Sequence, residues 1–266
     1  MDPEILDHYG KGVERDRLLG GGSRIEFART KELLERYLPP PPASVLDVGG
    51  GPGRYAAWLG ELGYVAHMVD PVPLHVEQAT ALAERTGIRF TTSVGDARHL
   101  EGPDASRDVV LMLGPLYHLV ERGDRMRALS EALRVVRPGG LVAVAAISRF
   151  ASLLDGLRNG YLGDPRFDAI VERDLRDGFH RNPTAELDFF TNAYFHHPGE
   201  LAEEVTDAGL RLEGVFGIEG PGWLLWELWD DPQGRESILR VARAVEQEPA
   251  LLGASGHLLA IARRRG

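Results

Sequence analysis

The sequence predicts an α/β fold in which helices cover a mostly parallel β-sheet. Short apolar segments such as 44–48 and 65–69 alternate with segments whose apolar residues recur every three or four positions. Such alternation predicts repeated strand–helix–strand units, which place neighbouring strands parallel to one another. The continuous apolar run 141–146 is a third observation, because it is typical of a strand buried on both faces of a sheet.

The strand–helix alternation occupies two stretches of the chain. In the first stretch we expect strands at 44–48, 65–69, 88–94, 108–113 and 141–146, and helices at 54–62, 74–83 and 124–136. In the second stretch we expect helices at 198–208 and 231–246 and strands at 211–218 and 256–262. The last strand is expected to pair antiparallel with the one before it.

Two segments do not follow the alternation. A helix is expected at 25–38 and ends at the prolines 39–42, which cannot continue it. Residues 148–197 are rich in Arg, Asp, Phe and His, and we interpret them as a helical lid inserted after the fifth strand. The predicted organisation is a helical N-terminal arm (1–42), a core (43–147 and 198–266) and a lid or substrate insertion (148–197).

Composition excludes several functional classes. The 266 residues contain no cysteine, which rules out disulfides, thiolate nucleophiles and cysteine-ligated zinc. A net charge of −10 disfavours a nucleic-acid partner, whose phosphates require a basic surface. No apolar run approaches the roughly 20 residues that cross a bilayer, and the polar N-terminus does not resemble a signal peptide. We therefore expect a cytoplasmic protein without a membrane partner, and a homodimer is compatible with the sequence.

A glycine-rich loop follows the first strand and leads into the first core helix. Glycines at 49, 51 and 53, with a further one at Gly50, let the chain turn sharply and approach a ligand closely. The dinucleotide fingerprint G-x-G-x-x-G would require a small residue at position 54, where this sequence has Arg54. Asp47 lies two residues before Gly49, so the loop better suits a ligand with an amino-acid end, whose ammonium the carboxylate can help to hold.

Two further acids lie at the ends of the next strands. Asp70 is followed by Pro71 and lies 21 residues after Gly49, a spacing that suits a carboxylate bound to ribose hydroxyls. Asp96 is followed by Ala97 just after the third strand, where it can accept a hydrogen bond from an adenine amino group. Since strand ends meet at one edge of a parallel sheet, these acids are expected to lie near the glycine loop.

These motifs together resemble the class I S-adenosylmethionine-dependent methyltransferases, particularly those that act on small molecules. The matching stretches are 45–53, Asp70, 95–97, 108–118 and 133–140. The resemblance implies a Rossmann-like, seven-stranded, mostly parallel sheet with an antiparallel last strand, and S-adenosylmethionine as cofactor. It also implies that the loop glycines flank the methionine part, that Asp70 binds ribose and that Asp96 binds adenine. The expected cofactor-binding residues are Asp47, Gly49, Gly50, Gly51, Gly53, Asp70, Pro71, Asp96, Ala97, Leu113 and Arg29.

The catalytic residues are marked less clearly, because methyl transfer needs alignment and a base only where the nucleophile must lose a proton. His118, after Tyr117 on the loop beyond the fourth strand, is the candidate base. The alternative is that both residues only pack or position the substrate, which is expected to be a small molecule methylated on N, O or C. Arg29 and Tyr9 in the N-terminal arm are candidates to contact the cofactor, Arg29 through the cofactor carboxylate.

Other polar and aromatic residues are candidates for a substrate or metal site. The adjacent pair His196 and His197 points in opposite directions and has no carboxylate partner at ligand spacing, so no metal site is expected. The lid residues that could line a substrate pocket, or instead lie on solvated helix faces, are Arg149, Phe150, Arg158, Arg173 and His180. Trp223, Trp226 and Trp229 could stack on an aromatic substrate or belong to the core.

Three alternatives to a small-molecule methyltransferase stay open at this point. An NAD(P)-dependent reductase uses the same sheet class, although Arg54 breaks its fingerprint. A nucleic-acid methyltransferase is disfavoured by the net charge of −10. A non-catalytic S-adenosylmethionine-binding protein would share the cofactor motifs but would not need the lid.

Overall fold

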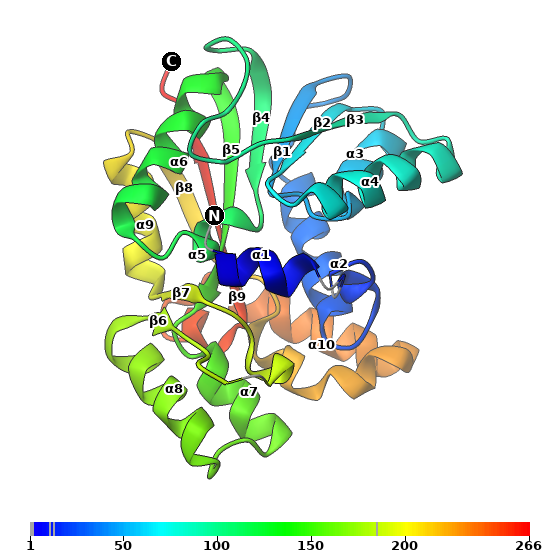
Figure 1. Ribbon diagram of the computed structural model, residues 1–266. Coiled ribbons are helices and arrows are strands. Elements are labelled where there is room, and N and C mark those ends of the chain that lie inside the picture. The colour runs from blue at the N-terminus through cyan, green and yellow to red at the C-terminus, as the bar shows by residue number, and fades with distance from the viewer. Residues whose placement is uncertain (1–2, 11, 13, 185) are drawn as a thin grey trace.

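The computed structural model describes residues 3–10, 12, 14–184 and 186–266, and its centre is a twisted sheet (Figure 1). The core strands follow one another in the order β3-β2-β1-β4-β5-β9-β8. Their bounds are β1 (Ser44–Val48), β2 (Val65–Asp70), β3 (Phe90–Val94), β4 (Arg107–Met112), β5 (Val136–Ser148), β8 (Arg211–Gly217) and β9 (His257–Arg263). Strands β1 to β5 are parallel to one another, whereas β9 runs antiparallel to both β5 and β8. The predicted α/β fold with an antiparallel last strand is confirmed.

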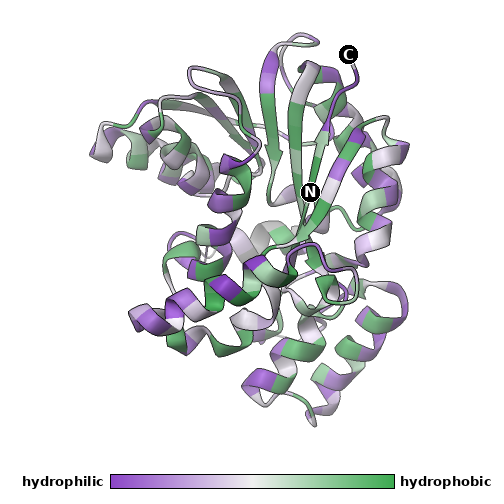
Figure 2. Ribbon diagram, turned by 180° about the vertical axis from the view of Figure 1, so that it is seen from behind, coloured by the Kyte–Doolittle hydropathy of each residue, from purple (hydrophilic) through white to green (hydrophobic). Residues whose placement is uncertain are grey.

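Helices cover both faces of this sheet. One apolar cluster joins α6 (Arg122–Val135) and α9 (Pro198–Asp207) to one face, and another joins α2 (Ser23–Glu35) and α3 (Arg54–Glu61) to the opposite face. Adjacent strand residues point to opposite faces, so Leu46 belongs to the first cluster and Val45 to the second. Figure 2 shows hydrophobic residues along the central strands and hydrophilic ones mainly on the outer helix surfaces.

The lid segment differs from its prediction. It contains helices α7 (Ala151–Asn159) and α8 (Pro165–Asp177), but also the short strands β6 (Phe179–His180) and β7 (Ala193–His196). Because β5 continues beyond the last residue of β4, its edge is open there, and β7 pairs with it in parallel through Ile147 and Phe195. The expected lid is therefore helical only in part, and two short strands join the segment to the sheet.

The N-terminal arm lies against the carboxyl edge of the sheet. Helix α1 (Pro3–Gly10) crosses this edge (Figure 1), and its buried Ile5 and Tyr9 pack on Val72 in the loop after β2. Helix α2 starts and ends slightly earlier than the predicted 25–38. The described helices also include α4 (Pro73–Thr86), α5 (Pro115–His118), α10 (Pro232–Val245) and the 3₁₀ segment η3 (Gly220–Asp230).

Every helix in the described part of the chain is too short or too polar to cross a membrane.

Candidate cofactor and substrate site

The loop between β1 and α3 is shaped by glycine backbone that other residues could not replace. Gly49, Gly51 and Gly53 have positive φ angles of 69°, 55° and 81°. A Cβ on Gly49 would lie 2.7 Å from Cδ of Pro115, and one on Gly50 would lie 2.6 Å from a carboxylate oxygen of Asp47. The loop is therefore a backbone cradle that passes close to the next loop and to the acid below it.

Asp47 forms the floor of this cradle. Its side chain is fully buried, and among the described residues neither carboxylate oxygen has a hydrogen-bond partner of normal geometry. Burial and the nearby Asp70 carboxylate raise the pKa of Asp47 to about 7, and the backbone amide of Ala56 offsets this only in part. A buried carboxylate without a partner is costly, so this position suits a cationic group brought by a ligand.

Asp70 fixes the loop from the end of β2. One oxygen accepts a hydrogen bond from the amide of Gly51 at 2.9 Å. The other oxygen accepts from the amide of Val72 at 2.9 Å and from Nδ1 of His75 at 3.0 Å. Asp70 therefore couples the glycine cradle to the loop after β2, at the point where a ribose is expected.

Most of the expected cofactor residues meet in one cleft at the carboxyl edge. The cleft is lined by Asp47, Gly49, Gly50, Gly51, Asp70, Pro71 and Leu113. Gly53 does not line it and instead lets α3 pack against Ala79. Asp96 and Ala97 do not line the cleft either, and Arg98 holds the Asp96 carboxylate at 2.6 Å and lowers its pKa. An adenine contact by Asp96 or Ala97 thus stays a prediction.

The expectation for Arg29 is corrected by the structure. Its buried guanidinium pairs with Glu32 at 2.7 Å and with Glu246 at 2.5 Å, and it donates to the carbonyl of Ile218. These contacts hold α2 against the sheet, away from the cleft. The arginine of the N-terminal arm that does line the cleft is Arg17.

His118 lines the cofactor cleft, as Tyr117 does, and both of its ring nitrogens are hydrogen-bonded. Nδ1 of His118 donates to the carbonyl of Asn192 at 3.3 Å, so in the neutral ring Nε2 accepts from the Tyr9 hydroxyl at 2.6 Å. Burial, with the nearby Tyr117 and Glu14, raises the pKa of Tyr9, which keeps that hydroxyl protonated. His118 therefore fastens α1 across the cofactor cleft, and the hydrogen bond occupies the nitrogen that a base would use.

A second cavity of about 370 Å³ adjoins the cofactor cleft. Four residues line both spaces, and they are Tyr9, Arg17, Glu26 and Tyr117. Its apolar wall is largely aromatic and comprises Phe167, Phe189, Phe190, Phe195, Trp223 and Trp226. A cavity of this size and lining suits a small organic molecule.

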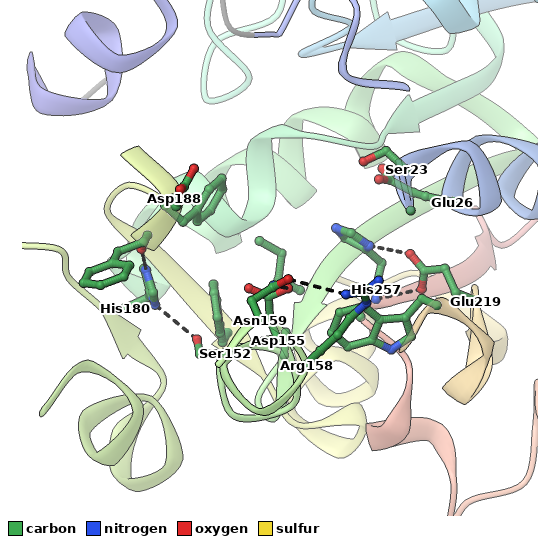
Figure 3. A pocket seen from close by; sticks show the side chains of 18 of the residues that line it. Ser23, Glu26, Ser152, Asp155, Arg158, Asn159, His180, Asp188, Glu219 and His257 are labelled. Carbon is green, nitrogen blue, oxygen red and sulfur yellow. Dashed lines mark hydrogen bonds and ion pairs between the residues drawn. The ribbon is translucent and has the colours of Figure 1, made fainter. Parts of the chain in front are cut away.

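The lid candidates divide between this cavity and the scaffold. Arg158 and His180 line the cavity (Figure 3). Arg149 donates instead to the carbonyl of Phe195 and to Glu200, Phe150 packs on His197, and Arg173 lines a separate surface hollow. Trp229 belongs to a buried cluster with Ile25.

The two adjacent histidines have structural roles. His196 is buried with Nε2 3.3 Å from Glu204, and burial lowers its pKa. His197 begins α9 in a capping box with Glu200. The two side chains are thus used separately, as their adjacency predicts.

Sequence patterns did not single out the polar end of the second cavity. There Glu26 of α2, Glu219 after β8 and His257 at the start of β9 bring ligand-type atoms within 4.8 Å of one another. In Figure 3 these three side chains lie on one side of the cavity, with Asp155 and Arg158 of α7 nearer its middle. Because Arg17 pairs with Glu26 at 2.6 Å, a metal ion at this cluster would have to compete with that guanidinium.

Comparison with known proteins identifies the family. A methyltransferase-domain model matches residues 45–140. An uncharacterized methyltransferase of Mycobacterium sp. (strain KMS) is 36% identical over 188 residues, which cover 69% of this chain and 68% of the relative. The chain belongs to the class I S-adenosylmethionine-dependent methyltransferases. The cofactor of this enzyme family is S-adenosylmethionine, and membership excludes the reductase alternative.

Further relatives of this methyltransferase agree on the fold and cover less of the sequence. A ubiquinone biosynthesis O-methyltransferase of Methylocella silvestris is 32% identical over 117 residues, 43% of this chain and 44% of the relative. This chain thus spans less than half of that relative's length. The crystal structure of an S-adenosylmethionine-dependent methyltransferase from Mesorhizobium loti superposes with a TM-score of 0.61 at 17% identity, covering 90% of this chain and all of the other.

The cleft fits the cofactor of this methyltransferase family. The glycine cradle leaves room for the methionine part, and the unpartnered Asp47 carboxylate matches its ammonium. Asp70 stands where the ribose is expected, with Pro71 and Leu113 on the walls. When bound, the cofactor supplies an electrophilic methyl group on a sulfonium.

Proposed function

We propose that this protein transfers the methyl group of S-adenosylmethionine to an N, O or C nucleophile of a small molecule bound in the second cavity. The observation that carries this proposal is the wall shared between the two spaces, formed by Tyr9, Arg17, Glu26 and Tyr117. A molecule in the second cavity would meet the cofactor at these shared residues, where the two spaces adjoin. The domain roles proposed are a cofactor-binding core (43–147 and 198–266), an arm (1–42) that closes the cleft and a lid (148–197) that encloses the substrate.

Each part of this site has a defined task in the proposed reaction. Asp47 and the glycine cradle hold the amino-acid end of the cofactor, and Asp70 orients its ribose. Tyr117 lies between the cleft and the cavity, where its ring can direct the acceptor toward the methyl group. The lid aromatic residues exclude water, which favours a displacement in which the two reactants must be aligned.

Two further facts support a small acceptor over a macromolecule. The two arginines that line the cavity, Arg17 and Arg158, are paired with Glu26 and Glu227, so they offer no free basic surface for the phosphates of a nucleic acid. The relative from Methylocella silvestris carries the name of an O-methyltransferase of ubiquinone biosynthesis, which implies a small substrate for that protein.

Cofactor binding is tested by calorimetry with S-adenosylhomocysteine, with NAD as the negative control. We expect micromolar binding of the first ligand and none of the second. The Asp70→Ala variant should bind at least about tenfold more weakly, because it loses the ribose contact and releases the Gly51 amide. Asp104→Asn is the matched control, since that carboxylate is exposed. Equal affinity in the Asp70→Ala and wild-type proteins would count against the assigned cleft.

The acceptor site is tested by filling the cavity. Ala151 lines it at the start of α7, so Ala151→Trp should lower methyl transfer to any small acceptor more than about tenfold by occluding the space. Affinity for S-adenosylhomocysteine should stay within about twofold. Leu157→Trp on the same helix is the control, because Leu157 is 67% exposed. The assay measures transfer of labelled methyl to a small-molecule extract. If the Ala151→Trp variant transferred as much label as wild type, the acceptor would bind elsewhere.

A further inference from the structure

Glu219 and His257 form a buried pair at the carboxyl edge of the sheet. Glu219 follows β8 and His257 opens β9, and these antiparallel neighbours are joined by a hydrogen bond from the amide of Ile218 to the carbonyl of His257 at 3.0 Å. The side chain of Glu219 is 3% exposed and that of His257 is 25% exposed, and both line the second cavity. The sheet itself therefore holds the pair in place.

The hydrogen bonds of this pair fix the orientation of the imidazole. Nδ1 of His257 donates to one oxygen of Glu219 at 2.6 Å. The other oxygen of Glu219 accepts from the Ser255 hydroxyl at 2.7 Å and from the amide of His257 at 3.0 Å. Because Glu219 binds Nδ1–H, the neutral ring carries its lone pair on Nε2, the nitrogen that Glu219 does not use.

Charged groups from several elements surround this imidazole. Glu26 comes from α2, Arg17 from the turn before it, and Asp155 and Arg158 line the same cavity from α7. Burial lowers the pKa of His257, and the positive charge of Arg17 lowers it further. The Glu26 and Glu219 carboxylates outweigh both effects and raise the pKa to about 9. Glu26 also lines the cofactor cleft, so the imidazole stands beside the wall where the two spaces meet.

Resting on the function proposed above, we propose that His257, oriented by Glu219, is the proton acceptor for methylation of a hydroxyl or amino group on an aromatic molecule. The acceptor oxygen or nitrogen forms a bond to the methyl carbon, and the electron pair of the broken carbon–sulfur bond stays on sulfur. The acceptor's proton passes to Nε2 of His257. His118, the candidate base from the sequence, has its Nε2 engaged by Tyr9.

The cavity determines the class of acceptor. Its aromatic wall suits a planar ring, and a proton acceptor works best against a donor of similar pKa. A phenolic hydroxyl, or an ammonium group on an alkyl side chain of the ring, has a pKa of about 10, close to that of His257, whereas an alkyl alcohol is far weaker as an acid. Carbon acceptors lack such a proton in most cases and are disfavoured.

The first test needs no acceptor. Histidine-labelled protein saturated with S-adenosylhomocysteine is titrated by NMR, and the His257 signal is assigned by its loss in His257→Asn. We expect a midpoint near 9 that falls by at least about one pH unit in Glu219→Gln, since the neighbouring negative charge is lost. Glu84→Gln, an exposed position on α4, is the control and should leave it unchanged. An ordinary His257 midpoint that does not respond to Glu219→Gln would overturn the proposal.

The second test is the pH profile of transfer to aromatic hydroxyl and amine probes. Wild-type kcat/KM should rise about tenfold per pH unit up to about 9 and then level off, because only the neutral imidazole accepts the proton. Glu219→Gln should move the plateau to lower pH, and His257→Asn should lose the histidine step and at least about 100-fold in rate. A His257→Asn enzyme with an unchanged profile and rate would refute the role. Absence of S-adenosylhomocysteine binding would instead refute the proposed function, whatever the NMR midpoints show.

Discussion

Replacing Asp47 with Asn should make the ligand-free protein more stable at pH 8, by up to about 4 kcal/mol, while weakening the binding of S-adenosylhomocysteine at least about tenfold. The two effects have one cause, which is a carboxylate buried beneath the glycine cradle with which no cation of the described residues pairs. Asn has nearly the same shape but carries no charge, so the cost of burying the charge disappears together with its attraction for the ligand's ammonium.

The pH dependence follows from the direction of the shift. The pKa of Asp47 is raised from 3.8 to about 7 in the folded protein. Between these values the unfolded chain loses a proton that the folded chain keeps, so the wild-type protein loses stability as pH rises from about 4 to about 7. Above the folded pKa no further loss is expected. Asp47→Asn lacks this dependence.

Urea unfolding at pH 5 and pH 8, with and without S-adenosylhomocysteine, measures both effects. Without ligand, Asp47→Asn should exceed wild type much more at pH 8 than at pH 5. With saturating ligand, wild type should gain more, because ligand binding stabilises only the form that binds it. Asp104→Asn serves as the exposed control. The decisive quantity is the difference in free energy of unfolding between ligand-free Asp47→Asn and wild type. If this difference were the same at pH 8 as at pH 5, Asp47 would not carry a buried charge.

The core strands and the cofactor loop could be predicted because their signals are local. Short apolar segments that alternate with helical ones mark β1 through β5. The turn after β1 requires glycines where φ is positive, as at Gly49 and Gly51. Asp47 and Asp70 lie at strand ends, and strand ends of a parallel sheet meet at one edge. The sequence therefore carries both the position and the approximate purpose of these residues.

Residues whose roles depend on distant partners could not be predicted in this way. Arg29 pairs with Glu246, which is 217 positions away, and helical periodicity does not say where a long side chain ends. Glu26, Glu219 and His257 likewise come from three separate elements and form no spaced motif. The available signal was weaker: Glu219 directly follows an apolar strand and His257 opens another, so both lie at the same edge as the cofactor loop.

Replacing Arg125 with Met should lower the free energy of unfolding by about 3–5 kcal/mol, because it leaves the Glu204 carboxylate buried without its partner. Arg125 is 2% exposed and donates to both oxygens of Glu204, the nearest at 2.7 Å. It also donates to the carbonyls of Leu119 and Val120, and its guanidinium lies 3.8 Å from the centre of the Tyr194 ring. One side chain thus joins α6, α9, β7 and the turn that follows His118.

The size of this effect should depend on pH in a defined way. In the wild-type protein, burial raises the pKa of Glu204, but hydrogen bonds from His196 and Arg125 outweigh it and lower the pKa to about 2. The stability that this carboxylate contributes is therefore present above its ordinary pKa and is lost as pH falls toward 2. In Arg125→Met the carboxylate has lost its buried guanidinium partner, so its pKa should rise. The deficit in stability should be largest near pH 7 and smaller at pH 4.

Arg127→Ala is the matched control, because Arg127 lies on the same helix with its side chain 69% exposed and should change stability by less than about 0.5 kcal/mol. The double variant Arg125→Met/Glu204→Met should recover part of the loss, since an apolar pair can replace a buried ion pair. Hydrogen exchange should also rise in residues 115–120, which carry Tyr117 and His118. If Arg125→Met lowered the free energy of unfolding no more than Arg127→Ala does, the ion pair would not be what holds residues 115–120. The hydrogen bond between His118 and Tyr9 would then keep α1 in place without it.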